Sequence, residues 1–437
     1  MRLKQRGTIN ACAREMGEVL VGGGQQLDTG KDQIHTPLLL SEVESESSSP
    51  PIKQTLAMES LTAANTRFSL DLFMKISSSN KGNVIFSPFS LSSALATVYL
   101  GARGDTAAQM AQTLHFHKAE EDVHIGFSQL LSLLNKPGAP YSLSIANRLY
   151  GEQSYQFDEK FLTDCKRHYK AELEPVNFQS GAEAARVNIN TWVEKQTNEK
   201  IKNLLAPGTI DHLTRLVLVN AIYFMGNWQK KFRPANTRET GFKINKYQSV
   251  PVMMMGQTSN FGLINIPEAK CQVLEMPYVG YELSMLIMLP NEVNGLEELE
   301  QKLTYENFTE WTRPNRMHIQ EVTVSLPKFK LEETYDMNQV LSSVGMVDAF
   351  DELKCDFSGM SPDSDLVLSK VVHKAFVEVN EEGTEAAAAT AAFMVVGCCA
   401  SLNRPLMFTA DHPFLFFIRH NPTKSILFYG RFCSPKA

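Results

Sequence analysis

Apolar residues in the first half of the chain recur at helical spacing and predict several helices. The stretch Leu61–Ile76 carries its apolar residues at mixed helical intervals, and Ser60 stands directly before it as an N-cap. Residues Ser90–Leu100 are apolar on nearly every side, which is typical of a helix buried in the core. Further helices are predicted near residues 106–114, 119–134, 158–168, 182–199 and 336–344.

Runs of β-branched and aromatic residues dominate the second half and predict strands. The clearest run covers residues 366–379, where Phe376 and Glu378 lie on the face opposite to Val377 and Val379. Further strands are predicted at residues 142–149, 215–224, 282–289, 319–329, 413–419 and 425–431. Because helices dominate the first half and strands the second, the pattern favours an α+β fold over alternating βαβ units.

A tract of small residues follows this long strand. Glu381–Glu385 leads into Ala386–Ala392, and no large side chain occurs before Phe393. One interpretation is a surface helix, because alanine is a strong helix former and Thr384 is a suitable N-cap. However, the tract has no apolar stripe to bury, and an isolated helix of about ten residues is marginal in water. The other interpretation is a segment that slides between two strands of a covered sheet, with Gly383 as its hinge.

The length of the chain, 437 residues, would accommodate several domains, but residues 58–437 contain no Pro/Gly/Ser-rich linker and no repeat. One large domain is therefore predicted, with 43% hydrophobic residues to supply its core. The net charge of −6 gives no reason to expect nucleic acid or an anionic membrane as a partner. The densest basic group, Lys230, Lys231 and Arg233, is interpreted as a solvated face.

Residues 1–57 differ from the rest in composition. They combine Gly22–Gly24, the acidic and serine-rich Glu42–Ser49 and the pair Pro50–Pro51 with few aromatic residues, which predicts a disordered N-terminal extension. The apolar run Leu38–Leu40 is too short for a signal peptide or a membrane span. The seven cysteines are scattered and form neither a disulfide framework nor a zinc pattern. We therefore expect a cytoplasmic protein, with release from the cell without a signal peptide as an alternative.

No enzyme site is recognised in the sequence. It has no Gly-x-Ser-x-Gly elbow, no His-Glu-x-x-His, no phosphate-binding glycine loop and no dinucleotide fingerprint. None of the ten histidines shares metal-ligand spacing with a cysteine or a carboxylate. The chain is therefore predicted not to be an enzyme and to need no metal or cofactor. His373 lies in an apolar strand, where a histidine is more often a hydrogen-bonded core residue than a catalyst.

Four segments resemble motifs of one family, the serpins. Residues 381–390 are similar, almost letter for letter, to the proximal hinge of inhibitory serpins. Asn83–Thr106 resembles the family's second helix and the turn after it, Val217–Trp228 the third strand of its main sheet, and Phe408–Arg419 its signature segment. The similarity covers about Met58–Pro435, and on it the chain is identified as a member of the ovalbumin-related intracellular (clade B) serpins.

The resemblance implies a serpin fold at residues 58–437, with an exposed reactive-centre loop at about residues 381–407. The fold would have a large mixed or antiparallel main sheet, two smaller sheets and about eight or nine helices. The implied activity is that of a monomeric suicide-substrate inhibitor of serine proteases. A target protease would cut the loop and form an acyl-enzyme, and the cleaved loop would insert into the main sheet before water could release the protease.

The resemblance also assigns roles to individual residues. A polar cluster under the centre of the main sheet matches Ser87, Ser90, Asn220 and His373, and Trp228 matches the residue at the top of the opening between two strands. The hinge matches Glu381, Glu382, Gly383, Thr384, Glu385, Ala386, Ala387, Ala388 and Ala389.

The position of the reactive bond follows from the family's usual spacing. Counted from Gly383, it lies between Gly397 and Cys398. The loop is a few residues longer than in the inhibitor of this type that it most resembles, so Val396 and Cys399 are rival positions.

These small, uncharged residues favour elastase-like target proteases over trypsin-like ones, while Phe393 or Met394 would suit a chymotrypsin-like protease. Two alternatives remain. The chain could be a non-inhibitory serpin-fold binding protein, or it could inhibit papain-like cysteine proteases, because the acyl trap also works on a thioester. The small residues Ala386–Ala389 favour an inhibitor that inserts its loop.

Overall fold

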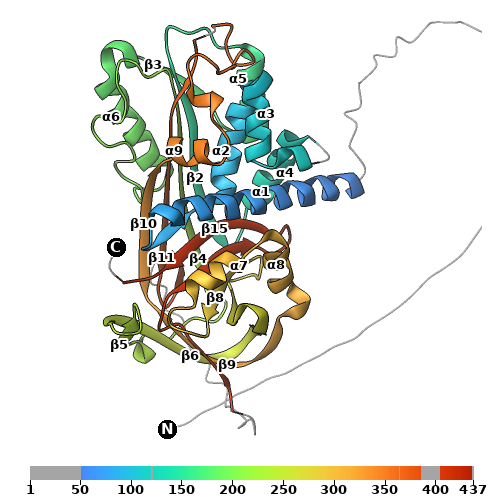
Figure 1. Cartoon of the computed structure of the whole chain (residues 1–437), viewed down its shortest axis with the longest axis vertical. Helices are drawn as coiled ribbons and strands as arrows, with labels where there is room; N and C mark the ends of the chain where they lie inside the picture. Colours follow the sequence, from blue (N-terminus) through green and yellow to red (C-terminus); the bar gives the residue numbers. More distant parts are fainter. Residues whose placement is uncertain (1–50, 120–121, 364, 385–403, 436–437) are drawn as a thin grey trace, which may run out of the picture. The chain divides into compact units, whose positions relative to one another are not determined.

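The computed structural model describes residues 51–119, 122–363, 365–384 and 404–435, with side chains from Met58 onward. The chain divides into two units, Met1–Ser48 and Ser49–Ala437, and every described residue lies in the second. Its helices are α1 (Pro51–Ser79), α2 (Pro88–Gly101), α3 (Gly104–Thr113), α4 (Val123–Leu134), α5 (Glu159–Tyr169), α6 (Phe178–Gln196), α7 (Leu296–Lys302), α8 (Tyr305–Trp311) and α9 (Asn338–Ser343), as Figure 1 shows.

Every helix predicted from the sequence is present in the structure. Helix α1 begins at Pro51 rather than Leu61, so it crosses the predicted domain boundary at Met58, and that boundary stays a prediction. Helices α7 and α8 were not predicted, because each has only seven residues and so too few turns to establish a periodicity. Among the described residues, no helix combines the length and apolar character that a membrane span requires.

The main sheet is mixed and, in the described part of the chain, contains six strands in the order β10–β11–β12–β4–β2–β3. Strand β4 runs parallel to β11, β2 runs parallel to β3, and the other pairs are antiparallel. The strands are β2 (Tyr141–Glu152), β3 (Leu173–Val176), β4 (Leu216–Asn227), β10 (Phe329–Asp336), β11 (Leu368–Val379) and β12 (Gly383–Thr384).

The second sheet has nine strands among the described residues, in the order β1–β15–β14–β8–β7–β6–β9–β13 with β5 beside β6. The two smaller sheets expected from the resemblance are therefore continuous. Strand β6 is 18 residues long and joins them, because its first part pairs with β5 and its last part with β7. These strands are β1 (Val84–Phe86), β5 (Arg238–Lys243), β6 (Ser249–Ile266), β7 (Cys271–Pro277), β8 (Leu283–Pro290), β9 (His318–Pro327), β13 (Leu406–Thr409), β14 (Phe414–His420) and β15 (Ser425–Phe432).

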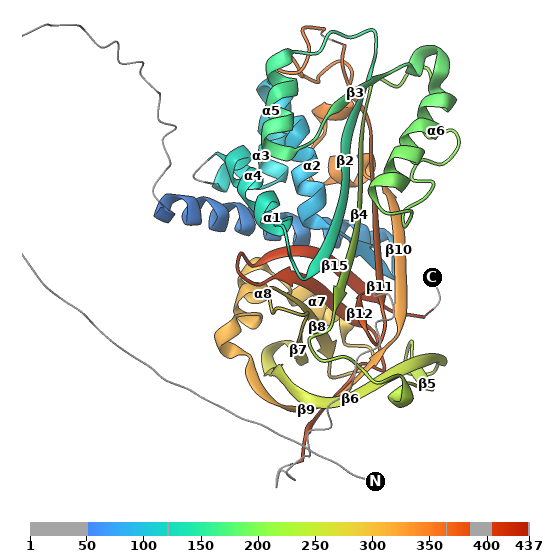
Figure 2. The ribbon, with the colours of Figure 1, turned by 180° about the vertical axis from the view of Figure 1, so that it is seen from behind.

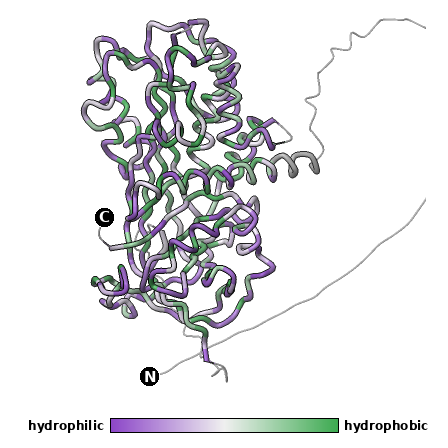
Figure 3. Tube along the Cα trace, viewed as in Figure 1, coloured by the Kyte–Doolittle hydropathy of each residue, from purple (hydrophilic) through white to green (hydrophobic). Residues whose placement is uncertain are grey.

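Both faces of the main sheet are covered. Figures 1 and 2 show α6 on one face and α2 on the opposite face. Along β4, alternate side chains enter two separate apolar clusters: Leu218, Ile222 and Phe224 pack on the α2 side, and Val219 and Tyr223 on the α6 side. In Figure 3, hydrophobic and hydrophilic residues alternate along much of the trace, as expected of elements with one buried face. A strand added to this sheet must therefore carry side chains that fit beneath helices on both faces.

Helix α2 is fixed at its start by local chemistry. Ser87 caps the helix, because its hydroxyl accepts a hydrogen bond from the backbone N–H of Ser90 at 3.2 Å, and Pro88 follows at the first helical position. Nearly all residues of the helix are buried, as the apolar sequence predicted. The cap brings Ser87 and Ser90 directly beneath the main sheet.

Candidate functional site

The chain leaves β11 at Val379, turns, and re-enters the main sheet as β12. Asn380 makes this turn: its side-chain Oδ1 accepts hydrogen bonds from the N–H groups of Glu382 (3.0 Å) and Gly383 (3.2 Å). Strand β12 pairs with β11 on one side, Thr384 opposite Val379, and with β4 on the other, Thr384 opposite Gly226. We call this end of the main sheet, where β12 lies between β4 and β11, the entry end.

Beyond the entry end, β4 and β11 pair directly with each other. Their parallel register extends from Leu368 beside Leu216 to Phe376 beside Tyr223. Strand β12 therefore occupies only the start of a slot that the rest of the sheet keeps closed.

Gly383 fits the slot because it has no side chain. A Cβ atom at this position would lie 2.0 Å from the carbonyl oxygen of Gly226 and 2.7 Å from Asn227 Cα. Both contacts are with backbone atoms, which cannot rotate away. Any other residue at position 383 would therefore push β12 out of the slot.

Thr384 is fully buried and contacts Tyr278, which comes from a distant part of the chain. Its hydroxyl is hydrogen-bonded to the hydroxyl of Tyr278 at 2.7 Å. The Tyr278 ring stacks on the indole of Trp228, with ring centroids 4.6 Å apart. The Trp228 indole N–H donates to the carbonyl oxygen of Asn380 at 3.0 Å, so the turn and the strand are held by the same aromatic pair.

Two carboxylates of the predicted hinge form ion pairs with the rest of the protein. Glu381 pairs with Lys328 at 2.9 Å and accepts a hydrogen bond from the Thr237 hydroxyl at 2.8 Å, and Glu382 pairs with Lys231 at 2.6 Å. Partial burial acts to raise the pKa of Glu381, but the hydrogen bonds from Lys328 and Thr237 outweigh it and lower the pKa. Glu381 therefore stays ionised, and both pairs stabilise the hinge in the entered position.

The predicted polar cluster lies further along the same slot. His373 on β11 is directly beside Asn220 on β4, and its Nδ1 lies 2.7 Å from Asn220 Oδ1. Its Nε2 accepts a hydrogen bond from the N–H of Ser87 at 3.0 Å, which assigns the ring proton to Nδ1. Asn220 in turn donates to the Ser90 hydroxyl at 2.8 Å. We call Ser87, Ser90, Asn220 and His373 the shutter cluster, because they link α2 to both strands that border the slot.

His373 is neutral in this cluster. Complete burial lowers its pKa to about 3, because the charged form would lose its hydration. The neutral ring donates at one nitrogen and accepts at the other, and both positions are occupied. The cluster thus holds the closed slot together without a buried charge.

The residues predicted from the sequence fall into three groups. Ser87, Ser90, Asn220 and His373 come together as one cluster. At the entry end, the N–H of Trp228 donates to the carbonyl oxygen of Glu382, next to Glu381, Gly383 and Thr384 in the chain. The remaining predicted residues lie outside the described part of the chain: Glu385, Ala386, Ala387, Ala388, Ala389, Val396, Gly397, Cys398 and Cys399.

Sequence reasoning missed the partners of the hinge. Asn380 had a recognisable signal, because asparagine directly before a glycine-containing turn favours hydrogen bonds to the following N–H groups. Tyr278, Lys231 and Lys328 had none, since they reach the hinge only through the tertiary fold.

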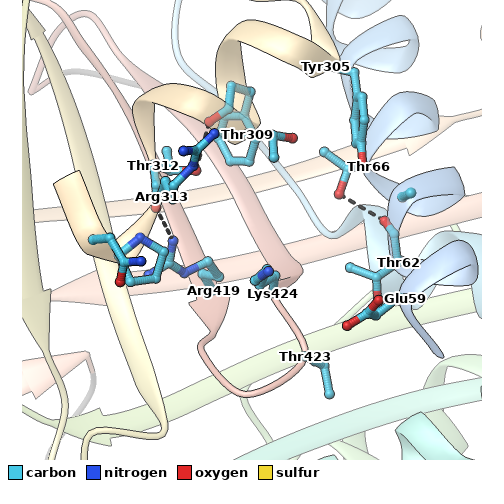
Figure 4. A pocket seen from close by; sticks show the side chains of 14 residues that line it. Glu59, Thr62, Thr66, Tyr305, Thr309, Thr312, Arg313, Arg419, Thr423 and Lys424 are labelled. Carbon is cyan, nitrogen blue, oxygen red and sulfur yellow. Dashed lines mark hydrogen bonds between the residues drawn. The ribbon is translucent and has the colours of Figure 1, made fainter. Parts of the chain in front are cut away.

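A surface cavity of about 570 Å³ lies apart from these groups, between α1, α8 and the β14–β15 turn (Figure 4). Its buried cation is Arg419, whose guanidinium donates to the carbonyl oxygen of Thr312 at 2.8 Å and to Glu275 at 3.2 Å. Because the protein itself satisfies this charge, the cavity contains no unpaired buried group that calls for a ligand. Within the described ranges, no group of three or more His, Cys, Asp or Glu is arranged to hold a metal ion.

The described cysteines are free thiols. Burial raises the pKa of Cys165 and Cys271 to about 12, and of Cys355 and Cys433 to about 11. All four are therefore protonated at neutral pH and are poor nucleophiles.

Comparison with known proteins agrees with this geometry. The family profile described as "Serpin (serine protease inhibitor)" matches residues 63–435. Serpin B6 from Pongo abelii is 54% identical over 380 residues, which cover 86% of this chain and 100% of that protein. Leukocyte elastase inhibitor from Homo sapiens is 52% identical over 383 residues, with 86% and 100% covered.

Solved structures show the same fold. Uncleaved ovalbumin superposes with a TM-score of 0.80 at 39% identity, covering 86% of this chain and 100% of that one. Maspin superposes with a TM-score of 0.81 at 38% identity, covering 87% and 100%. The predicted resemblance to ovalbumin-related serpins is confirmed, and the chain belongs to the serpin family of serine protease inhibitors.

Proposed function

We propose that this serpin traps elastase-like or chymotrypsin-like serine proteases by inserting its cleaved reactive-centre loop between β4 and β11. The observation that carries the proposal is β12. Gly383 and Thr384 already pair with β4 at the entry end, and Thr384 also pairs with β11. The segment that follows them needs only to continue the same pairing after the loop is cut.

The register of β12 predicts where each loop residue would go. Strand β12 is antiparallel to β4, so each step forward along the loop is one step back along β4. Thr384 lies opposite Gly226. Thr390, six residues further along the loop, would therefore lie opposite Asn220 in the shutter cluster. Ten residues after Thr384, Met394 would lie opposite Leu216, the first residue of β4.

The same register accounts for the small residues. Directly opposed residues point to the same face, so Ala386 and Ala388 would lie on the α2 side of the sheet and Ala387 and Ala389 on the α6 side. Both faces are already packed, and a larger side chain at these positions would collide with them.

The energetics of insertion are favourable. Opening the slot breaks one ladder between β4 and β11, and the new strand forms two, a net gain of one ladder. A ladder of on the order of ten hydrogen bonds at about 1 kcal/mol each gives about 10 kcal/mol. Thr384 and Gly397 are 13 residues apart (397 − 384), or about 43 Å of strand at about 3.3 Å per residue. Insertion would carry the attached protease over this distance.

The target class rests on the residues at the reactive bond. Val396, Gly397 and Cys398 are small and uncharged, which suits the small primary pocket of an elastase. The similarity to leukocyte elastase inhibitor supports the same class. Phe393 and Met394 would provide a second cleavage site for a chymotrypsin-like protease.

We further propose that the protein acts as a monomer in the cytoplasm, without a cofactor and independently of membranes and nucleic acid. Its similarity to the ovalbumin-related serpins and its scattered cysteines support this location. It would not be an enzyme, since its reaction with a protease consumes the inhibitor.

Incubation with neutrophil elastase and with chymotrypsin tests the proposal. We expect a complex that survives denaturing electrophoresis. We also expect the mass of the released C-terminal peptide to match a peptide that begins at Cys398. Cleavage without a stable complex would favour a non-inhibitory binding protein. A stable complex with papain, but with neither serine protease, would move the target to the cysteine proteases.

A further inference from the structure

The alanine-rich part of the loop specifies its own strand register poorly. A shift of one residue in a strand moves every side chain to the other face, and large side chains normally forbid such a shift. Ala386–Ala389 fit either face equally well. A loop that enters quickly, before the acyl-enzyme is hydrolysed, therefore needs an anchor outside this tract.

The entry end contains such an anchor. The hydroxyl of Tyr278 is hydrogen-bonded to that of Thr384 at 2.7 Å, and both side chains are buried. Within the described chain, this hydroxyl makes no other hydrogen bond. A shift of β12 by one residue would turn the Thr384 side chain to the opposite face of the sheet and break the contact.

The position of Tyr278 is set independently of the loop. Its ring stacks on Trp228 with 15° between the planes and meets Phe224 edge-to-face, with ring centroids 5.1 Å apart. Its backbone forms a β-bridge with Trp228, and the N–H of Val279 donates to the carbonyl oxygen of Asn227 at 2.8 Å. The position of the Tyr278 hydroxyl is therefore fixed by its own packing, whether or not the loop has inserted.

Two glycines allow the loop to come close enough. A Cβ atom on Gly226 would lie 3.1 Å from Cδ1 of Tyr278 and 2.6 Å from Cζ of Phe224, and one on Gly383 would collide with the Gly226 carbonyl oxygen. Because neither position carries a side chain, Thr384 reaches the tyrosine hydroxyl while β12 stays paired with β4.

We propose that Tyr278 is a positioning residue of the inhibitory reaction, whose hydroxyl holds Thr384 so that the cleaved loop enters the main sheet in a single register. The inference rests on the proposed loop-insertion function. Without the anchor, some loops start in the wrong register or start late. Their acyl-enzymes are then hydrolysed, and the protein is consumed as a substrate.

The test compares Tyr278→Phe with the unmodified protein. This change removes one hydroxyl and keeps the ring that packs on Trp228. The readout is the stoichiometry of inhibition, the amount of inhibitor consumed per protease trapped. The contact is a hydrogen bond of about 1 kcal/mol, so we expect the ratio of substrate turnover to trapping to rise about fivefold.

Three further variants separate positioning from stability. Thr384→Val removes the other hydroxyl and should have the same effect as Tyr278→Phe. The double variant Tyr278→Phe/Thr384→Val should have no higher stoichiometry than either single variant. Thr384→Ser keeps the hydroxyl and should trap as efficiently as the unmodified protein. Tyr141→Phe is the matched control. Tyr141 lies on β2, the strand next to β4, and its hydroxyl donates a hydrogen bond of 3.0 Å to the carbonyl oxygen of Leu134 in α4 rather than to the hinge. It should lower the melting temperature without changing the stoichiometry.

The outcomes distinguish this inference from the proposed function. If the unmodified protein is cleaved but traps nothing, the proposed function fails. If the unmodified protein traps elastase and the Tyr278→Phe and Thr384→Val variants trap it with unchanged stoichiometry, only the role of Tyr278 is overturned.

Discussion

At the scale of single residues, the shutter cluster depends on an uncharged histidine. His373 has no exposed surface, and its two ring nitrogens bond to Ser87 and Asn220. A protonated ring would lose the acceptor that holds the Ser87 N–H and would place a charge in the core. The stability of the closed slot therefore depends on pH through the protonation of His373.

Acidification should weaken the shutter cluster, because it favours the charged form of His373. His373 has a folded-state pKa of about 3 and an ordinary value of 6.5, so its contribution is complete above pH 6.5 and is lost progressively as the pH falls toward 3. The loss is at most about 1.4 kcal/mol per pH unit, or about 2 kcal/mol at pH 5. We expect the melting temperature of the uncleaved protein to fall by about 2–4 °C between pH 7 and pH 5 on this account.

The comparison protein for that measurement is His373→Gln. His124 and His420 also have lowered pKa values, about 4 in each case, because they are buried, and they contribute with the same sign in both proteins. The difference in pH dependence between the two proteins isolates His373. Parallel curves for the two proteins would contradict the assignment.

Thr384 is the residue at which a single charge should convert the inhibitor into a substrate. The side chain is fully buried, and an arginine there would have to be buried between two strands at a cost of several kcal/mol. In the variant Thr384→Arg we expect the reactive bond to be cut normally and trapping to fall more than tenfold, since about 1.4 kcal/mol corresponds to a factor of ten. Denaturing electrophoresis after mixing with elastase measures both products.

Thr384→Ser is the control for this change, because it keeps the hydroxyl that bonds to Tyr278. A Thr384→Arg protein that forms stable complexes as efficiently as its parent would show that the hinge is assigned to the wrong residues.

At the scale of elements, the slot between β4 and β11 is a strand position that is filled only at its entry end. Cutting the loop between Phe393 and Cys399 should allow the rest of the position to be filled, so the melting temperature should rise sharply. Differential scanning calorimetry of the intact and singly cut protein measures the change. The same melting temperature for both would favour a serpin-fold protein that does not insert its loop.

The elements that could be predicted from the sequence are those whose pattern is complete within one segment. Strand β11 is rich in β-branched and other apolar residues, and α2 is apolar on nearly every side and has its cap in the preceding residue. Strand β6 was not predicted, because it borders two strand groups in turn and its buried positions change along its length. A periodic sequence pattern reveals a strand only when the same face is buried along its whole length, and the buried face of β6 changes along the strand.

The candidate site shows the same division. The shutter cluster and the hinge were predicted through motifs of the resembled family. The structure places Ser87, Ser90, Asn220 and His373 within hydrogen-bonding distance of one another, and their roles stay predictions. The contact between Tyr278 and Thr384 joins residues 106 positions apart in the sequence. It depends on how two sheets pack at one corner, which no local pattern specifies.

At the scale of the whole molecule, the inhibitor is expected to function without its first 57 residues. The family profile begins at residue 63, and relatives that are matched over their entire length cover only 86% of this chain. The charged, serine-rich composition of residues 1–57 supplies little apolar surface for packing. Protein lacking these residues should therefore trap elastase at the same rate and melt at the same temperature.

A second truncation makes this prediction sharper, because α1 begins at Pro51 and so extends beyond the predicted boundary. Protein lacking residues 1–50 keeps the whole helix, whereas protein lacking residues 1–57 loses its first two turns, far from both the hinge and the shutter cluster in sequence. If the boundary at Met58 is correct, the two truncated proteins and the full chain should have melting temperatures within about 2 °C, or less than about 1 kcal/mol. A lower melting temperature in the shorter protein alone would place the start of the domain at Pro51. Slower trapping in both would mean that residues 1–50 act on the loop-insertion step.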